Sequence, residues 1–237
     1  MMKVLLLGVN GLLGHACFNE LINNSNIKVV GTIRNRKDLN LAYFKSQKKN
    51  LIVVKNLFKF ENLDHLFKKV KPDIVINCVS IEKKYFNDLP KLVEAYSIFP
   101  KKLVQVCRSY SARLILFSSD GVFSGKKGNY IESSPADAKN YYGIAKYLGE
   151  IESKKCLIIR TSMIGHSIKL NSGLLDWFLS QRVSCNGYGN VYFSGLTNIE
   201  IAKIISNTII NNEKLNGIIH ISSKPISKYK LLLKLKK

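Results

Sequence analysis

The chain has 237 residues, 46% of them hydrophobic and 22% charged, which excludes an intrinsically disordered protein and allows one large domain or a domain with a small appendage. Its 37 Lys and Arg residues against 16 Asp and Glu residues give a formal net charge of +21. Only six of the basic residues are arginine and the lysines are spread along the whole chain, whereas nucleic-acid readers use arginine forks and clustered basic stripes. The composition therefore predicts no nucleic-acid partner, and an attraction for small anions such as nucleotides.

The five cysteines are widely separated and form no CxxC pair, which is typical of reduced thiols inside a cell. The apolar start at residues 4–7 is followed by interrupting glycines and no cleavage site, and no uncharged apolar run reaches the roughly 20 residues that span a bilayer. We therefore expect a cytoplasmic protein without membrane insertion. The four histidines are scattered without ligand spacing, so no metal site is expected.

Short β-branched runs alternate with segments of helical spacing, as βαβ units of a parallel sheet require. Strands are predicted, in chain order, at residues 3–7, 28–32, 51–54, 74–77, 114–118, 156–160 and 217–221. Helices are predicted at residues 12–23, 63–69, 89–110, 136–153, 173–181 and 198–211, with a last capped helix beginning near residue 226. The predicted fold class is α/β, a Rossmann-type doubly wound parallel sheet with a smaller C-terminal region.

The first predicted strand runs directly into Gly8-Val9-Asn10-Gly11-Leu12-Leu13-Gly14, which opens the first helix. In a dinucleotide-binding βαβ unit, the first glycine allows the tight turn, the second lets the backbone approach the pyrophosphate, and the third permits close packing of helix on strand. Glycine at a turn alone indicates only a turn, so the interpretation depends on the strand–turn–helix context. In that context we interpret the segment as a pyrophosphate-binding loop.

The second predicted strand ends in Gly31-Thr32-Ile33-Arg34-Asn35-Arg36, where an acidic residue would select NAD through the ribose hydroxyls. Arginine at this place offers a bidentate partner to a 2′-phosphate. The sequence therefore favours NADP(H) as cofactor, with Arg34 as a ligand. Asp38 lies near enough along the chain to leave NAD(H) as the alternative.

Tyr142 and Lys146 lie four residues apart, on one face of a predicted helix. A phenol with an ordinary pKa near 10 is a poor acid–base group at neutral pH, and an adjacent ammonium would stabilise its anion. Ser119, at the end of the fifth predicted strand, could hydrogen-bond and polarise a substrate carbonyl. Each residue alone would more often be structural, but the three together behind a phosphate-binding loop predict carbonyl oxidoreduction.

With these motifs the chain resembles the extended short-chain dehydrogenase/reductases, and among them the dTDP-4-dehydrorhamnose reductase-like enzymes of sugar nucleotides. The matching stretches are GVNGLLG, KPDIVINC, FSSDGVFSGKKGNYIE, YGIAK and IIRTSMIG, which cover most of residues 2–165. The resemblance implies that residues 1–165 form an NAD(P)-binding Rossmann domain and residues 166–237 a smaller substrate-binding region packed on it.

The resemblance also implies roles for individual residues. Tyr142 would be the general acid–base, Lys146 its electrostatic partner and a ribose ligand, and Ser119 the hydroxyl that orients the carbonyl. The expected cofactor-binding residues are Gly8, Asn10, Gly11, Leu12, Leu13, Gly14, Arg34, Asn56, Cys78, Val79, Tyr142, Lys146, Thr161 and Ser162. The expected substrate-binding residues are Ser119, Asp120 and Trp177.

Four positions depart from the pattern of this family. Asn56 stands where an aspartate near the adenine is usual, Ser97 where an asparagine is common, and Val79-Ser80 where two alanines are common. Trp177 could stack on a sugar or a base, although its apolar neighbours at helical spacing also fit a core. The chain stops soon after residue 233, where members of the family usually continue, so the C-terminal region is either natively short or truncated.

These observations predict a cytoplasmic reductase that uses NADP(H) to reduce the keto group of a nucleotide-activated deoxysugar in surface-polysaccharide biosynthesis. An epimerase would use the same three residues. A non-catalytic NAD(P)-binding regulatory subunit is the alternative of another class, which the short C-terminus favours and the intact Ser119, Tyr142 and Lys146 oppose. The expected partner is a nucleotide sugar, with a homodimer as the expected assembly.

Overall fold

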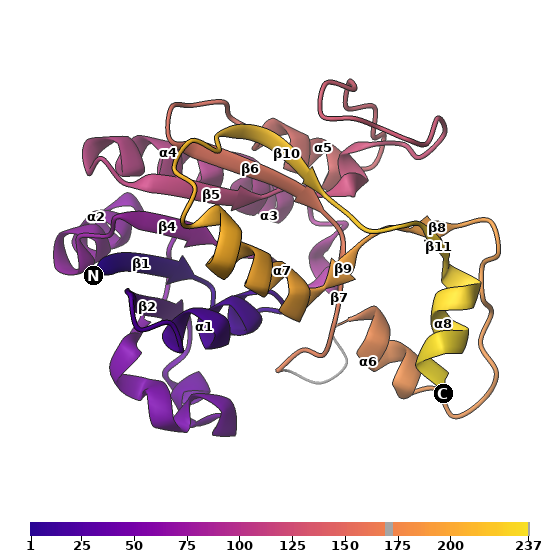
Figure 1. The fold of residues 1–237 in the computed structure, drawn as a ribbon, viewed down its shortest axis with the longest axis horizontal. Coiled ribbons are helices and arrows are strands. Elements are labelled where there is room, and N and C mark those ends of the chain that lie inside the picture. The colour runs from indigo at the N-terminus through magenta and orange to yellow at the C-terminus, as the bar shows by residue number, and fades with distance from the viewer. Residues whose placement is uncertain (169–172, 237) are drawn as a thin grey trace.

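The computed structural model describes residues 1–168 and 173–236, which fold around a parallel sheet of seven strands (Figure 1). The strands are β1 (Met2–Leu7), β2 (Ile27–Ile33), β3 (Leu51–Val53), β4 (Ile74–Asn77), β5 (Arg113–Phe117), β6 (Cys156–Thr161) and β10 (Gly217–Ile221). Their order across the sheet is β10-β6-β5-β4-β1-β2-β3. All seven strands predicted from the sequence are thus confirmed, with bounds that differ by one residue or less.

The strand order reverses between β1 and β4, which pair in parallel with Leu7 opposite Asn77. In open sheets of this kind, ligands bind in the crevice beyond the carboxyl ends of the strands at this reversal. Both the glycine loop, which follows β1, and Cys78, which follows β4, lie at that edge. The fold therefore places the predicted cofactor site where doubly wound sheets hold their ligands.

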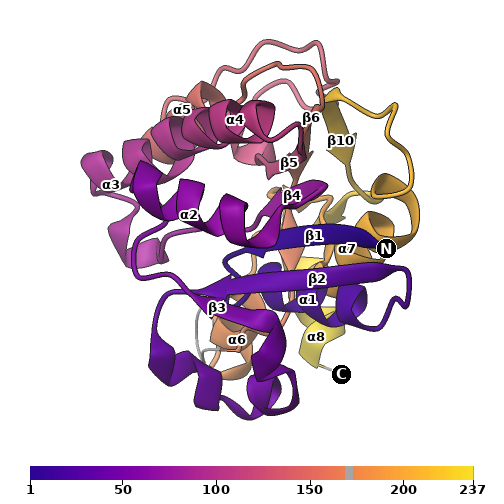
Figure 2. The same ribbon diagram turned by 90° about the vertical axis from the view of Figure 1, so that its left-hand side faces the viewer.

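Helices cover both faces of the sheet (Figure 2). On one face lie α1 (Gly14–Ile22) and α7 (Asn198–Ile204), the latter continued by a π turn at Ile205–Ile209. On the other lie α2 (Phe60–Val70) and α4 (Phe99–Ser109). Residues of β1 alternate between the two cores, with Val4 and Leu6 in the first and Leu5 and Leu7 in the second, as a strand buried on both faces requires.

The C-terminal segment is shared between the sheet and a smaller part beyond the ends of its strands (Figure 1). Strand β10 and helix α7 belong to the main body, although the sequence analysis grouped them with the smaller region. The smaller part comprises α6 (Leu174–Leu179), α8 (Lys228–Lys236) and the antiparallel pair β8 (Tyr192–Phe193) and β11 (Ile226–Ser227). A parallel pair, β7 (Met163–Ile164) and β9 (Leu196–Thr197), connects it to the sheet.

Two predicted helices differ from the observed ones. The helix expected over residues 136–153 is α5 (Tyr141–Leu148), because the Asn140 side chain caps its start by accepting from the Gly143 N–H at 2.8 Å. The helix expected over residues 89–110 consists of α3 (Leu89–Val93), a π turn at Glu94–Ile98, and α4. Residues 36–50, for which no helix was expected, form short 3₁₀ turns. In the part of the chain that the structure describes, no helix has the length and hydropathy that a bilayer crossing requires.

Candidate active site

The glycine loop makes a tight turn between β1 and α1. Gly8 has a φ of +80°, a conformation that glycine adopts without strain, and its N–H donates to the Thr32 hydroxyl at 3.1 Å. The Gly11 N–H donates back to the Gly8 carbonyl at 3.2 Å. A Cβ on Gly14 would lie 2.1 Å from that same carbonyl oxygen, so only glycine permits this packing of α1 on the turn. The loop therefore directs the N-terminus of α1 at the crevice, as phosphate binding requires.

A cleft of about 270 Å³ opens beside this loop. Its lining combines the ends of β1, β2 and β4 with the segment after β3, and comprises Gly8, Asn10, Gly11, Thr32, Ile33, Arg34, Val54, Lys55, Asn56, Leu57, Phe58, Cys78, Val79, Ser80 and Ile81. Seven of these residues were predicted from the sequence to bind the cofactor. Gly8, whose positive φ disfavours a side chain, Gly11 and the basic Arg34 in one lining suit a dinucleotide, so the residues present fit that group.

The polar residues around the cleft have defined partners. The Asn10 amide donates to the Asp38 carboxylate at 2.6 Å, which places this buried acid beside the glycine loop. Asn56 accepts the Phe58 N–H at 2.8 Å and thereby shapes the turn after β3. Arg34 lines both this cleft and a neighbouring cavity of about 510 Å³, which Arg36 and Lys55 also line. A cationic surface thus adjoins the end of β2.

Tyr142 and Ser119 meet because α5 packs closely on the turn after β5. A Cβ on Gly143 would lie 2.2 Å from the Gly121 carbonyl oxygen. A Cβ on Gly121 would lie 3.2 Å from both the Ser119 hydroxyl oxygen and the Tyr142 ring, so these two side chains lie side by side. The Ser119 hydroxyl also accepts the Gly121 N–H at 3.0 Å and donates to Asp120 at 3.1 Å. The structure therefore brings together the two residues that the sequence predicted to bind a carbonyl oxygen.

Aromatic side chains enclose the ring of Tyr142. Phe86 stacks on it with ring centroids 4.7 Å apart, and Tyr96 meets it edge-on at 5.5 Å. Burial raises the pKa of Tyr142, and the hydrogen bond with Ser119 opposes that rise. The sequence predicted that Lys146 would bring this pKa toward neutrality, but burial is the largest influence on it and the charge of Asp120 raises it further. Tyr142 is accordingly protonated at neutral pH.

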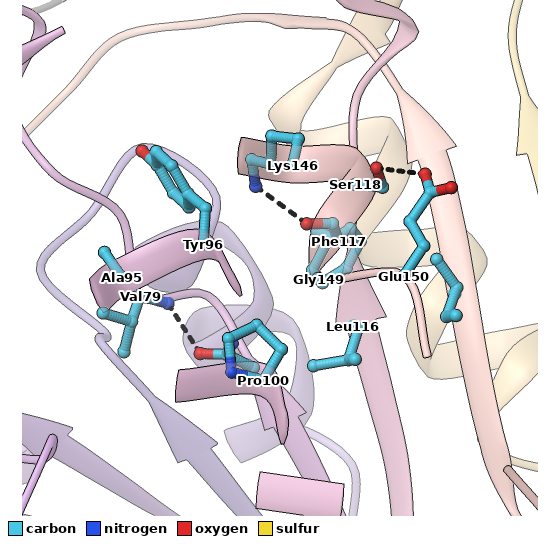
Figure 3. A pocket seen from close by; sticks show the side chains of 12 residues that line it. Val79, Ala95, Tyr96, Pro100, Leu116, Phe117, Ser118, Lys146, Gly149 and Glu150 are labelled. Atoms are coloured by element: carbon cyan, nitrogen blue, oxygen red, sulfur yellow. Dashed lines mark hydrogen bonds between the residues drawn. The ribbon is translucent and has the colours of Figure 1, made fainter. Parts of the chain in front are cut away.

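Lys146 points along the same helix face toward the end of β5 (Figure 3). Its ammonium donates to the Phe117 carbonyl at 2.9 Å and lies 4.3 Å from the centroid of the Tyr96 ring. Burial lowers the pKa of Lys146 to about 8, and the negative charge of Glu150 opposes this change. Lys146 is therefore a cation at neutral pH that is close to losing its proton.

A buried ion pair holds the end of α5 against the sheet. Glu150 and Arg160 are 2% and 4% exposed, and the Arg160 Nη2 lies 2.7 Å from the Glu150 Oε2. Arg160 Nε donates to the other carboxylate oxygen at 2.9 Å, and the hydroxyl of Ser118 donates to that same oxygen. Ser118, Glu150 and Lys146 line one small cavity of about 20 Å³ (Figure 3). The pair thus fixes the segment that follows Lys146.

The remaining predicted residues lie at different distances from this centre. The buried Thr161 hydroxyl donates to the Ile221 carbonyl at 2.8 Å, which turns it toward β10. The Ser162 hydroxyl donates to Asp120 at 3.1 Å and so joins the hydrogen-bond network of Ser119. Trp177 is 41% exposed on α6. Its role as a substrate contact stays a prediction.

No sequence signal was used to predict Phe86, Tyr96 or Glu150 as site residues. Tyr96 lies in the π turn between α3 and α4, and such turns are frequent at functional sites. Glu150 follows Lys146 by four residues, a spacing that brings charged side chains together on one helix face. Phe86 carried no signal, because nothing in its local sequence distinguishes it from a core residue. Within residues 1–168 and 173–236 no cluster of metal-ligating side chains is found.

The class of protein follows from the sheet and the site together. The chain is a Rossmann-type protein of the extended short-chain dehydrogenase/reductase class, with this strand order, a glycine loop after β1, Ser119 after β5, and Tyr142 and Lys146 on α5. Residues 2–172 match the RmlD substrate binding domain, and the chain belongs to this family.

Among solved structures, the chain resembles a hypothetical dTDP-4-dehydrorhamnose reductase from Sulfolobus tokodaii, with a TM-score of 0.81 and 24% identity over 99% of this chain and 81% of that one. A dTDP-4-dehydrorhamnose reductase from Bacillus anthracis, solved in complex with NADP, gives a TM-score of 0.80 and 20% identity over 99% of this chain and 80% of that one. At these identities the likeness shows a common fold.

Two curated relatives bear a different name. The chain is 28% identical to methionine adenosyltransferase 2 subunit beta of Xenopus tropicalis over 156 residues, which are 62% of this chain and 41% of that protein. It is 24% identical to the protein of the same name from Danio rerio over 249 aligned positions, which cover 97% of this chain and 71% of that protein. The chain thus spans less than half of the first relative and about seven-tenths of the second.

Proposed function

We propose that this protein reduces the keto group of a nucleotide-activated deoxysugar with NADPH. The observation that carries the proposal is that Ser119 and the Tyr142 ring lie side by side at the carboxyl edge of the sheet, with the Lys146 ammonium on the same helix face as Tyr142. This arrangement can hold a carbonyl oxygen and deliver a proton to it. The substrate class rests on the family and on the reductases that share the fold.

Each residue has a distinct chemical task. The reduced nicotinamide supplies the hydride when the cofactor is bound. Tyr142, which burial keeps protonated, donates the proton that the carbonyl oxygen needs as it becomes an alcohol. Ser119 donates a hydrogen bond to the same oxygen and holds it in place. Lys146, on the same face of α5, would hold the cofactor ribose, and its positive charge would favour the phenolate that remains after the proton has moved.

The residues around the cleft support NADP(H) over NAD(H). Arg34, at the end of β2, lines the cleft and also the cavity shared with Arg36 and Lys55, where a 2′-phosphate would meet positive charge. The Bacillus anthracis relative was solved with NADP. Asp38 accepts a hydrogen bond from Asn10 of the loop, and its carboxylate supports NAD(H) as the second choice.

The direct test is to titrate the protein with NADPH and with NADH by fluorescence, and then to add a panel of 4-keto-6-deoxy sugar nucleotides. We expect saturable binding of NADPH and substrate-dependent loss of the reduced-nicotinamide absorbance. Binding without oxidation of the cofactor by any sugar would contradict the reductase, and no binding would contradict the assignment of the glycine loop. Formation of an epimerised sugar without net oxidation of the cofactor would identify an epimerase instead.

A non-catalytic regulatory subunit is the second candidate, because the curated relatives are named methionine adenosyltransferase 2 subunit beta. This candidate predicts dinucleotide binding, no turnover with any sugar nucleotide, and stable association with a methionine adenosyltransferase. Size-exclusion chromatography of the mixed proteins, with and without NADPH, separates the two proposals.

We further propose a homodimer in the cytoplasm that serves surface-polysaccharide synthesis. Helix α5 exposes apolar side chains to solvent, namely Tyr141, Ile144, Tyr147 and Leu148, which a second copy could cover. The cysteines that the structure describes are free thiols, which supports a reducing compartment. Sedimentation equilibrium tests the assembly, and a monomer at micromolar concentration would contradict it.

A further inference from the structure

A side chain from the far end of the sequence contacts the glycine loop. Asn198, the first residue of α7, is 3% exposed, and its amide donates to the Leu12 carbonyl at 2.8 Å. Leu12 lies between the second and third glycines of the loop, 186 residues away along the chain. Helices α1 and α7 lie next to each other on the same face of the sheet (Figure 1), which brings the two residues together.

His15 extends this contact to a second carbonyl of the loop. Its Nδ1 lies 2.9 Å from the Gly11 carbonyl oxygen, and its Nε2 lies 3.4 Å from the Asn198 amide nitrogen. Burial lowers the pKa of His15, so the ring is neutral at pH 7. A neutral ring carries one N–H, and both contacts are satisfied when Nδ1 donates to Gly11 and Nε2 accepts from Asn198. The three residues therefore form one directed set of hydrogen bonds.

The fold leaves little room for Asn198 to move. Ile201 and Ala202, one turn further along α7, are fully buried in the core shared with α1. On the other side, a Cβ added at Gly165 would lie 2.1 Å from the Asn198 Oδ1. The position of the Asn198 amide is thus fixed by the packing of α7 on the core. Its close approach to Gly165 is possible only because that residue has no side chain.

We propose that Asn198 is a positioning residue for the dinucleotide site, and that its bridge through His15 to the Gly11 and Leu12 carbonyls sets the affinity for NADPH. These carbonyls belong to the turn whose N–H groups face the crevice, so fixing one end of each peptide fixes the direction of the other. The bridge also makes the affinity for the cofactor depend on the docking of the C-terminal segment. This inference rests on the proposed function.

The expected size of the effect follows from population. Without the bridge the turn would sample other conformations, and only a fraction of the molecules would be able to bind NADPH. The apparent dissociation constant equals the intrinsic one divided by that fraction, so a fraction of about one-tenth weakens binding about tenfold. Asn198→Ala removes both donors. Gly165→Ala is an independent variant, because it displaces the amide without replacing it. Thr197→Ala is the matched control, since Thr197 caps α7 by accepting the Glu200 N–H at 3.1 Å but does not contact the loop.

The test measures the dissociation constant for NADPH and, without any dinucleotide, the hydrogen exchange of the amides of residues 8–17. We expect Asn198→Ala and Gly165→Ala to bind NADPH about tenfold more weakly and to exchange faster in this segment, whereas Thr197→Ala lowers the melting temperature and changes neither. Unchanged affinity and exchange in Asn198→Ala would overturn the proposal, as would an equal loss in Thr197→Ala. Failure of the wild-type protein to bind NADPH would instead refute the proposed function. The hydrogen-exchange measurement needs no dinucleotide, so it would still show whether Asn198 fixes the loop.

Discussion

Replacing Glu150 with glutamine removes one charge from an ion pair whose two side chains are 2% and 4% exposed. Arg160 then keeps its charge in a buried site, where breaking such a pair costs about 3–5 kcal/mol. For a protein of this size each kcal/mol lowers the melting temperature by about 2–4 °C, so Glu150→Gln should lower it by roughly 6–20 °C. The double variant Glu150→Leu/Arg160→Met leaves neither partner of this ion pair alone and should recover much of the loss.

Thermal unfolding followed by circular dichroism measures this effect, with Glu82→Gln as the control. Glu82 pairs with Lys84 at 2.7 Å, but both side chains are more than 60% exposed, so this variant should melt like the wild type. A melting temperature of Glu150→Gln equal to that of the control would refute the reasoning. So would a double variant that is less stable than Glu150→Gln.

Three further predictions concern the cofactor site. Burial lowers the pKa of Lys146 from 10.5 to about 8, so between pH 8 and 10.5 the unfolded chain binds more protons than the folded one. The stability that this residue contributes is therefore fully present above pH 10.5 and is lost as the pH falls to about 8. Lys146→Met should abolish that part of the pH dependence in urea unfolding, and an unchanged profile would contradict the burial of the ammonium. Arg34→Ala should weaken binding of NADPH roughly 10- to 100-fold, the value of a charged hydrogen bond, and leave NADH unaffected; equal losses for both would exclude a phosphate contact. Gly14→Ala, whose Cβ would lie 2.1 Å from the Gly8 carbonyl, should abolish dinucleotide binding in a fluorescence titration, whereas Gly189→Ala, which meets open space, should bind normally.

The sheet could be predicted because its signals are local. Each strand is a short apolar run, the strands inside the sheet are largely buried, and the glycine loop marks where the first strand ends. The spacing of Tyr142 and Lys146 also specifies one helix face, and the structure places Tyr142 beside Ser119 and the Lys146 ammonium at the end of β5. The ends of the helices were predicted less accurately. The start of α5 depends on the Asn140 cap, which apolar periodicity does not reveal.

The rest of the site depends on contacts between distant segments. Phe86 stacks on Tyr142 across 56 residues of sequence, and Asn198 reaches Leu12 across 186. Neither partner carries a motif, because an aromatic ring or an amide at a helix start has many ordinary roles. The pKa of Tyr142 was also beyond the sequence, since the sign of the shift depends on how deeply the ring is buried.

The central claim is that Tyr142 protonates the carbonyl oxygen during reduction, and single-turnover kinetics with NADPH and a 4-keto-6-deoxy sugar nucleotide test it most directly. The wild type should oxidise bound NADPH in one exponential phase, whereas Tyr142→Phe should bind NADPH with unchanged affinity and oxidise it at least about a hundredfold more slowly, as expected when a general acid is removed. Oxidation at the wild-type rate in Tyr142→Phe would contradict the account.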